Sequence, residues 1–205
     1  MLSWDESKME TPSKLIKYNV HSSFQSIPLP TIQAISSNLA IPCALMFYNL
    51  NGDINVGMSI RSAAVFGCSD VYIVGKRAYD KRSVVGAHNY LRVHRHHSVP
   101  PEFFQEQKLV PILLEQGGTA IEEFDFKPYL PGKMEAGWKP VLIVGSENVG
   151  LPKELVHSLK GAPILTISQY GLIRSLNVSN ASTIVLYEFA RQWRKDVLSR
   201  NDCFK

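Results

Sequence analysis

The chain has 205 residues, 45% of them hydrophobic and 20% charged, which suits one domain with a sizeable core and excludes an intrinsically disordered protein. No apolar run approaches the roughly 20 residues that a membrane-spanning helix needs, and the first residues lack the apolar stretch of a secretory signal. The cysteines Cys43, Cys68 and Cys203 are too few and too scattered for a disulfide framework or a zinc cluster. We therefore expect a protein of the cytoplasm that is stabilised by its hydrophobic core.

Positive charge is concentrated in one segment, although the net charge of the whole chain is only +4. Between Lys76 and His97 the only acidic residue is Asp80, and the basic residues are Lys76, Arg77, Lys81, Arg82, Arg92 and Arg95. Such a patch suits a polyanion such as nucleic acid, and an ordinary solvated surface explains the charges equally well. The histidines of the segment do not predict a metal site, because their basic neighbours would repel a cation.

Residues 1–40 are polar and rich in serine and proline, which predicts an N-terminal arm on the surface, with residues 26–32 as an extended segment. Beyond this arm we expect a single domain over residues 41–205, in which apolar strand-like runs alternate with segments of helical periodicity. The expected strands are residues 43–50, 71–75, 110–115, 140–145 and 163–168. The expected helices are residues 56–66, 101–109, 151–159 and a long one from residue 179 towards residue 198.

Apolar strands that alternate with helices predict an α/β fold, in which a mainly parallel sheet is covered by helices on both faces. In such sheets, ligands bind at the carboxyl ends of the strands, in the loops that lead into the following helices. The positions to search therefore follow Leu50, Gly75, Glu115, Gly145 and Ser168.

At the first informative junction, Asn55 stands where a helix N-cap is expected, and Gly57 permits close approach of another chain segment. Arg61 follows within the helix, among small and apolar neighbours. A single arginine on a helix usually lies on a solvated face, but these neighbours favour a position that faces a crevice.

The second junction places Glu147 between two glycines, Gly145 at the end of a buried strand and Gly150 before a helix. The spacing matches neither the dinucleotide-binding glycine pattern nor a Walker A loop, so it does not predict a phosphate cradle. Glu147 can simply complement the dipole of the following helix. That role leaves the two glycines unexplained, and they suggest a flat ligand that approaches the backbone.

The third junction, residues 171–180, carries more polar side chains than one helix cap requires. Gly171 ends the strand segment, and Ser175 and Asn177 precede the long helix. Asn177 and Asn180 also begin two N-x-S sequons, which have no meaning outside a secretory compartment. The excess of polar groups beside an apolar strand indicates a binding or reaction site, and helix capping is the alternative.

Together and in this order, the three junctions resemble the three sequence motifs of the SpoU (TrmH) class of SPOUT RNA methyltransferases. The matching positions are Asn55-x-Gly57-x3-Arg61-x-Ala63-x2-Phe66-Gly67, Gly145-x-Glu147-x2-Gly150-Leu151 and Gly171-x2-Arg174-Ser175-Leu176-Asn177-Val178-Ser179. The resemblance extends over about residues 43–192. It departs at Asn148, where the family often has glycine, and at Ser168, where the family usually has proline.

The resemblance implies a parallel α/β sheet whose C-terminal part threads through a loop to form a deep trefoil knot. It also implies S-adenosylmethionine as the methyl donor, without a metal ion, held in the knotted loops largely by backbone groups. The donor would be bound at Glu115, Gly145, Ile167 and Leu176, with its adenine between Ile167 and Leu176. Members of the family act as homodimers in which each site borrows groups from the partner subunit.

The implied reaction transfers a methyl group to a ribose 2′-hydroxyl of tRNA or rRNA. The residues that would organise it are Asn55, Arg61, Glu147, Ser175 and Asn177. The family assigns proton removal to the arginine that matches Arg61, yet a guanidinium normally keeps its proton. Arg61 therefore either acts as the base or clamps an RNA phosphate beside the reacting hydroxyl.

The basic segment then becomes the expected RNA-contacting surface, through Arg82, Arg92 and Arg95. Two other functions fit the same fold: a non-catalytic RNA-binding or assembly protein, and an RNA methyltransferase that acts on a base. The intact set of polar site residues argues against the first, and the Ser175-Leu176-Asn177 turn favours ribose over a base. The sequence leaves open which RNA is modified, and residues 1–40 suit an RNA-guiding arm and a dimer strap equally well.

Overall fold

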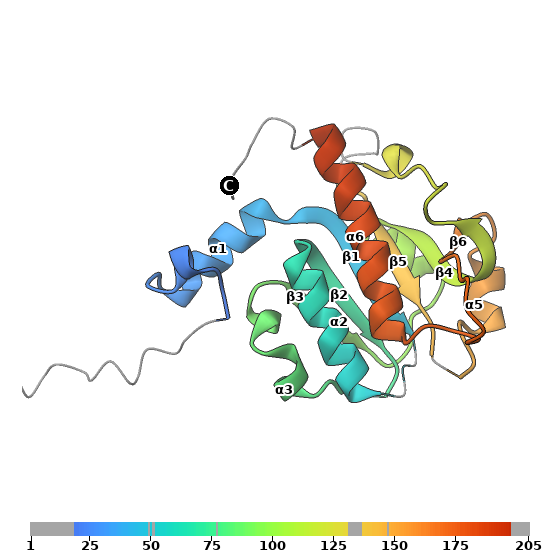
Figure 1. Cartoon of the computed structure of the whole chain (residues 1–205), viewed down its shortest axis with the longest axis horizontal. Coiled ribbons are helices and arrows are strands. Elements are labelled where there is room, and N and C mark those ends of the chain that lie inside the picture. The colour runs from blue at the N-terminus through green and yellow to red at the C-terminus, as the bar shows by residue number, and fades with distance from the viewer. Residues whose placement is uncertain are drawn as a thin grey trace, which may run out of the picture.

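The chain folds around a six-stranded sheet in which every strand pairing is parallel, with the order β3-β2-β1-β5-β4-β6 (Figure 1). The structure, a computed structural model, describes residues 19–48, 50, 52–76, 78–130, 137–146 and 148–197. The strands are β1 Ile41–Tyr48, β2 Cys68–Val74, β3 Arg92–His96, β4 Leu109–Ala120, β5 Lys139–Val144 and β6 Ile164–Thr166. The helices are α1 Leu29–Leu39, α2 Asp53–Val65, α3 Lys81–Val84, α4 Glu102–Glu106, α5 Lys153–Ser158 and α6 Val178–Val197, with 3-10 turns η3 Ser22–Phe24, η4 Ala87–Asn89 and η5 Lys127–Tyr129.

Two hydrophobic layers form the core, one on each face of the sheet. In the central strand β1, Leu45 and Phe47 point into the layer that α2 and α6 cover, whereas Ala44 and Met46 point into the layer that α4 and α5 cover. These four side chains are fully buried, because a strand in the middle of a covered sheet exposes neither face. Figure 1 shows α2 and α6 side by side over one face. The predicted α/β fold, with helices on both faces of a parallel sheet, is confirmed. Across the described residues, no helix combines the length and the apolarity that crossing a bilayer requires.

The described part of the predicted N-terminal arm contains a helix, which corrects the expectation of an extended segment over residues 26–32. Helix α1 begins at Leu29, with Pro30 in its first turn, where the missing N–H costs no hydrogen bond. Gln33 Nε2 of α1 donates to Asn89 O at 3.1 Å, which fixes the helix beside η4. The proline that suggested an extended chain therefore marks a helix start.

The basic segment contains an edge strand, β3, that the apolar pattern of the sequence does not predict. Val93 is its one apolar residue among five, so nothing local distinguishes β3 from a solvated loop. Contacts with the neighbouring strand stabilise β3 in place of an apolar pattern, since β3 pairs with β2 along its whole length. In addition, the rings of His94 and Tyr72 stack at a centroid distance of 4.6 Å.

Asp70, in β2, is a buried carboxylate that ties three basic side chains to the amino end of the sheet. Its side chain is 2% exposed, accepts hydrogen bonds of 2.8 Å from Arg92 Nε and Nη2, and lies 2.7 Å from His94 Nε2. Lys139 Nζ of β5 donates to the same carboxylate. Burial alone would raise the pKa of Asp70, but the bonds from Arg92, Lys139 and His94 together hold that pKa well below its usual range.

Asp70→Asn is expected to lower the free energy of unfolding at pH 7 by about 2–3 kcal/mol, because Lys139 loses its counter-charge in a half-buried position. The folded pKa is depressed, so this stabilisation is complete above the unfolded value of about 3.9 and is lost as the pH falls below it. Urea denaturation should therefore show a smaller difference between variant and wild type at pH 3 than at pH 7. Asp80→Asn, which breaks an ion pair with the exposed Arg82, should cost far less. An equal loss in the two variants would contradict a special role for Asp70.

Candidate active site at the carboxyl ends of β4, β5 and β6

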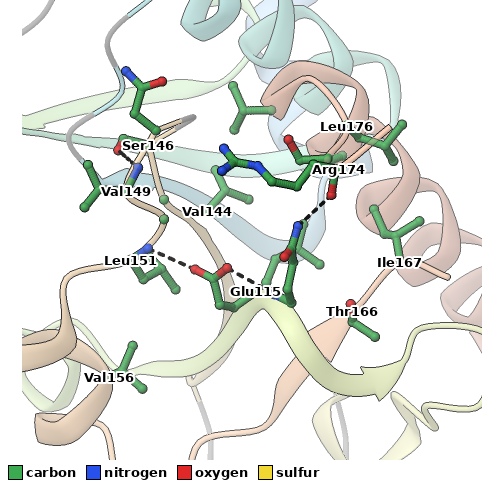
Figure 2. A pocket seen from close by; sticks show the side chains of 18 of the residues that line it. Glu115, Val144, Ser146, Val149, Leu151, Val156, Thr166, Ile167, Arg174 and Leu176 are labelled. Carbon is green, nitrogen blue, oxygen red and sulfur yellow. Dashed lines mark hydrogen bonds between the residues drawn. The ribbon is translucent and has the colours of Figure 1, made fainter. Parts of the chain in front are cut away.

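A pocket of about 890 Å³ opens where β5 and β6 end, beside the middle of β4 at Glu115. Figure 2 shows its lining, with Ile167 and Leu176 on one side and Ser146, Val149 and Leu151 on the other. The four positions expected to bind a donor all line this pocket: Glu115, Gly145, Ile167 and Leu176. The fold therefore brings these four positions, which come from three separate segments of the chain, to one cavity.

Gly145 is required by the packing of the chain against itself. The loop that follows β5 closes through hydrogen bonds from Ser146 N to Gly150 O at 3.1 Å and from Gly150 N to Ser146 O at 2.9 Å. A Cβ added at Gly145 would lie 2.2 Å from the carbonyl carbon of Gly150, far inside contact distance. The close approach that the sequence suggested for a ligand is thus made by the backbone of Gly150 and Leu151.

Glu115, the residue at which β4 reaches the pocket, holds this loop in place. Its Oε2 accepts a hydrogen bond of 3.0 Å from Leu151 N, and its Oε1 accepts one of 3.0 Å from Gln116 N. Gly150 adopts a φ of +69°, and a Cβ there would lie 2.4 Å from Glu115 Oε2. The carboxylate therefore acts as a clamp on the loop backbone at the floor of the pocket.

The loop between β6 and α6 forms the opposite wall and carries a cation that received no role from the sequence. Gln116 Nε2 donates to Arg174 O at 2.9 Å, which ties this loop to β4. Figure 2 shows the Arg174 side chain extending over the pocket from that wall. Lys153 and Lys160 reach the same pocket from α5 and its C-terminal turn. The match of Arg174 to the third motif could have marked it as a pocket residue. No motif marks Lys153 and Lys160, which reach the pocket only because of how α5 packs.

Asn177 joins the third motif to the first. Its Oδ1 accepts hydrogen bonds from Ser179 N at 2.8 Å and from Ser179 Oγ at 2.6 Å, so it caps the N-terminus of α6. Its Nδ2 donates to Asn55 Oδ1 at 3.1 Å, across 122 positions of sequence. This one amide therefore caps α6 and also links the third junction to the first, while its role in a reaction site stays a prediction.

Asn55 is not the helix cap that the sequence predicts, because α2 begins two residues earlier, at Asp53, after Gly52. It lies in the first helical turn, which turns its side chain towards Asn177. Ser175 is exposed and lines the pocket beside Leu176. Glu147, the remaining candidate of the second motif, lies outside the described residues.

Arg61 is exposed on the outer face of α2 and does not line the pocket that holds the expected donor positions. Ile54, seven residues before Arg61, is 53% exposed, and Val65, four residues after it, is 68% exposed. Helical spacing places all three on one face of α2. Arg61 thus has exposed apolar neighbours, and its expected place in a crevice stays a prediction.

The three arginines expected to contact RNA do not form one surface. Arg82 is bound to Asp80, with Nη2 at 2.7 Å from Oδ2, and Arg92 is bound to Asp70 at the amino end of β3. Arg95 is close to the carboxyl end of β3 and points to the opposite face of the sheet from Arg92.

No group of three or more His, Cys, Asp or Glu side chains suited to a metal ion occurs within the described ranges.

A parallel sheet with a ligand-sized pocket at the carboxyl ends of its strands, and tight glycine turns around that pocket, defines an α/β ligand-binding domain. The chain belongs to the SpoU rRNA methylase family, whose family model matches residues 42–187. The family expected from the three motifs is therefore confirmed.

Individual relatives agree with this assignment. The chain is 30% identical over 155 residues to an uncharacterized tRNA/rRNA methyltransferase of Mycobacterium leprae (strain TN). The aligned region covers 71% of this chain and 46% of the relative. The chain thus spans about half the length of that curated relative. Among solved structures it is similar to the SpoU methyltransferase AviRb from Streptomyces viridochromogenes in complex with AdoMet, with 26% identity, a TM-score of 0.60, and coverage of 73% of this chain and 57% of that one. The A. aeolicus TrmH/SpoU tRNA modifying enzyme shares the fold, with 22% identity, a TM-score of 0.68, and coverage of 86% and 88%.

Proposed function

We propose that the chain is an RNA methyltransferase of the cytoplasm that transfers a methyl group from S-adenosylmethionine to a ribose 2′-hydroxyl of tRNA or rRNA. The observation that carries this proposal is the hydrogen bond between Asn177 and Asn55, which joins two motifs beside the pocket that holds all four expected donor positions. A structural neighbour with 23% identity and a TM-score of 0.60, described as an RNA 2′-O ribose methyltransferase, shares the fold.

The pocket fits the proposed donor in size and in chemistry. Its volume of about 890 Å³ is in the range of small-molecule sites, and Ile167 and Leu176 offer apolar side chains to an adenine. Arg174 supplies a cation for the carboxylate of the donor. When bound, S-adenosylmethionine supplies the electrophilic methyl group.

The remaining groups would position the ribose. A ribose hydroxyl is a poor nucleophile, so it must be oriented in line with the methyl group and must lose a proton. Ser175 and the Asn55–Asn177 pair lie at the N-terminal end of α6, where they can hydrogen bond a ribose. The trefoil knot stays a prediction that is supported by the family. The bond from Gln116 Nε2 to Arg174 O fastens the loop between β6 and α6 to β4.

A homodimer follows from the same proposal, because Arg61 lies away from the pocket of its own chain. Exposed apolar side chains surround it on α2 and continue onto α6: Ile54, Met58, Val65, Ile184 and Tyr187. An apolar face of this kind favours a protein interface, and the family associates as homodimers. Contact between two such faces would carry Arg61 towards the pocket of the partner.

Light scattering should find a dimer for the wild type and a monomer for Tyr187→Asp, because a charge at the centre of an apolar interface must be desolvated. Leu39→Asp is the matched control: Leu39 is also half-exposed, at 46%, but lies on α1. A wild-type monomer, or a dimer that survives Tyr187→Asp, would place the interface elsewhere.

Asn177→Asp separates helix capping from site formation. Aspartate caps as well as asparagine, so the free energy of unfolding should change by less than about 0.5 kcal/mol. The carboxylate cannot donate to Asn55 Oδ1, so methyl transfer should fall about tenfold or more through misplacement of the ribose. Asn177→Ala should lower both stability and activity. Full activity of Asn177→Asp would limit Asn177 to capping.

Incubation of the purified protein with methyl-labelled S-adenosylmethionine and total cellular RNA tests the proposed reaction directly. Alkaline or nuclease digestion should then yield a labelled, ribose-methylated dinucleotide. A labelled base would instead show a base-directed methyltransferase. RNA binding without any label would indicate a non-catalytic RNA-binding protein on the same fold.

A further inference from the structure

A second, smaller pocket lies at the carboxyl ends of β2 and β3. Its volume is about 330 Å³, and its lining residues are Ile73, Gly75, Lys76, Arg95, His96 and His97. Gly75 N donates to His96 O at 2.9 Å, which joins the two strand ends at the base of the pocket. Among the described residues that line it there is no Asp or Glu, so its potential is positive.

Arg95 is held ready for a ligand in this pocket. Its guanidinium carbon lies 5.4 Å from the centroid of the Tyr79 ring, a cation–π contact that orients the planar fork while leaving its hydrogen-bond donors available. Arg82 and Arg92 differ, because both form bidentate contacts with a carboxylate. Of the three arginines expected to contact RNA, Arg95 is thus the one whose charge is not compensated by a carboxylate in the described ranges.

The strand order places this pocket beside the proposed reaction site. β1 lies between β2 and β5, so its carboxyl end, which leads to Asn55, has the small pocket on one side and the donor pocket on the other. Neighbouring strands are about 4.8 Å apart, which puts the ends of β3 and β5 about 14 Å from each other. A single RNA strand can cover this distance within a few nucleotides.

We infer that Lys76 and Arg95 form a backbone-phosphate subsite for single-stranded RNA, which delivers the target nucleotide to the end of β1. This inference rests on the proposed function and refines it, because it assigns RNA contact to the carboxyl edge of β2 and β3 and not to Arg82 or Arg92. The subsite recognises phosphate and carries no sequence preference, so the choice of nucleotide must come from other contacts.

The test measures binding of a labelled random-sequence RNA of about 12 nucleotides by fluorescence anisotropy, without methyl donor and at several salt concentrations. The double variant Lys76→Ala/Arg95→Ala should bind at least about tenfold more weakly, since hydrogen bonds to charged groups are the strong ones. The slope of log affinity against log salt should fall by about 0.7 for each phosphate that the variant no longer neutralises. The control is Arg194→Ala/Lys195→Ala, which removes the same two charge types from the far end of α6, about 24 Å along the helix from Val178.

Unchanged binding of the Lys76→Ala/Arg95→Ala variant would overturn the inference, and so would an equal loss in the control, because that would indicate a general charge effect. Lys76→Ala alone, at an exposed position, serves as a second variant that cannot fail through misfolding. The proposed reaction is judged separately by label transfer to cellular RNA. A wild type that binds RNA through Lys76 and Arg95 but transfers no label would keep the subsite and reject the enzyme.

Discussion

Arg61→Lys is expected to lower the rate of methyl transfer by about 100-fold or more, because a planar forked donor is replaced by a point charge at a position that requires orientation. Both roles proposed for Arg61, base and phosphate clamp, lead to this result. Affinity for the donor, measured by calorimetry, should stay unchanged, since both roles of Arg61 act on the RNA and not on the donor. Turnover near the wild-type rate would reject both roles.

Mixed dimers show whether Arg61 acts on the partner's pocket. If it does, a dimer of one Arg61→Ala subunit and one Gly145→Ala subunit contains one intact site, formed by the pocket of the first and Arg61 of the second. At a donor concentration that saturates the wild type but not Gly145→Ala, random mixing of the two variants should therefore restore about a quarter of wild-type activity. If Arg61 acts within its own chain, every site carries one defect and mixing restores nothing.

Gly145→Ala is expected to weaken donor binding by about 30- to 100-fold, the equivalent of about 2–3 kcal/mol of overpacking. The new methyl group would collide with three backbone atoms, the carbon and oxygen of Gly150 and the nitrogen of Leu151, all within 2.4 Å. Backbone cannot rotate away as a side chain can, so the wall of the pocket must move. Calorimetry with S-adenosylmethionine measures the effect.

The matched control for this substitution is Gly171→Ala. Gly171 belongs to the third motif, but a Cβ there meets nothing within 4 Å and its φ is not in the positive range. Donor affinity should therefore remain within about twofold of wild type. A large loss at Gly171 together with a small loss at Gly145 would contradict the packing that this fold assigns to the two glycines.

The sequence predicted the elements whose signal is local and apolar. The five expected strands are all present, because continuous buried runs such as that of β1 have few other structures to adopt. β3 was missed because its stability comes from pairing with β2 and from Asp70, which lies 22 positions from Arg92. α1 was missed because Pro30 is as typical of an extended chain as of a first helical turn.

For the site, the motifs identified the segments but not how these segments touch one another. That Asn177 faces Asn55 depends on the side-by-side packing of α2 and α6, which no spacing within either helix encodes. The clamp formed by Glu115 depends on a backbone N–H 36 positions away, at Leu151. Arg61 faces outwards because of how α2 is rotated about its axis against the sheet, which the sequence does not encode. Apolar neighbours are expected both in a crevice and on an uncovered interface, so they could not distinguish the two.

The carboxylate of Glu115 has a consequence for how this wall of the pocket can diverge among relatives. It grips a main-chain N–H, a group that every residue except proline provides, so this hydrogen bond does not depend on which side chain stands at position 151. A substitution at Val149, whose side chain is 83% exposed at the pocket, can therefore change the rim of the pocket while the bond from Leu151 N to Glu115 stays as it is.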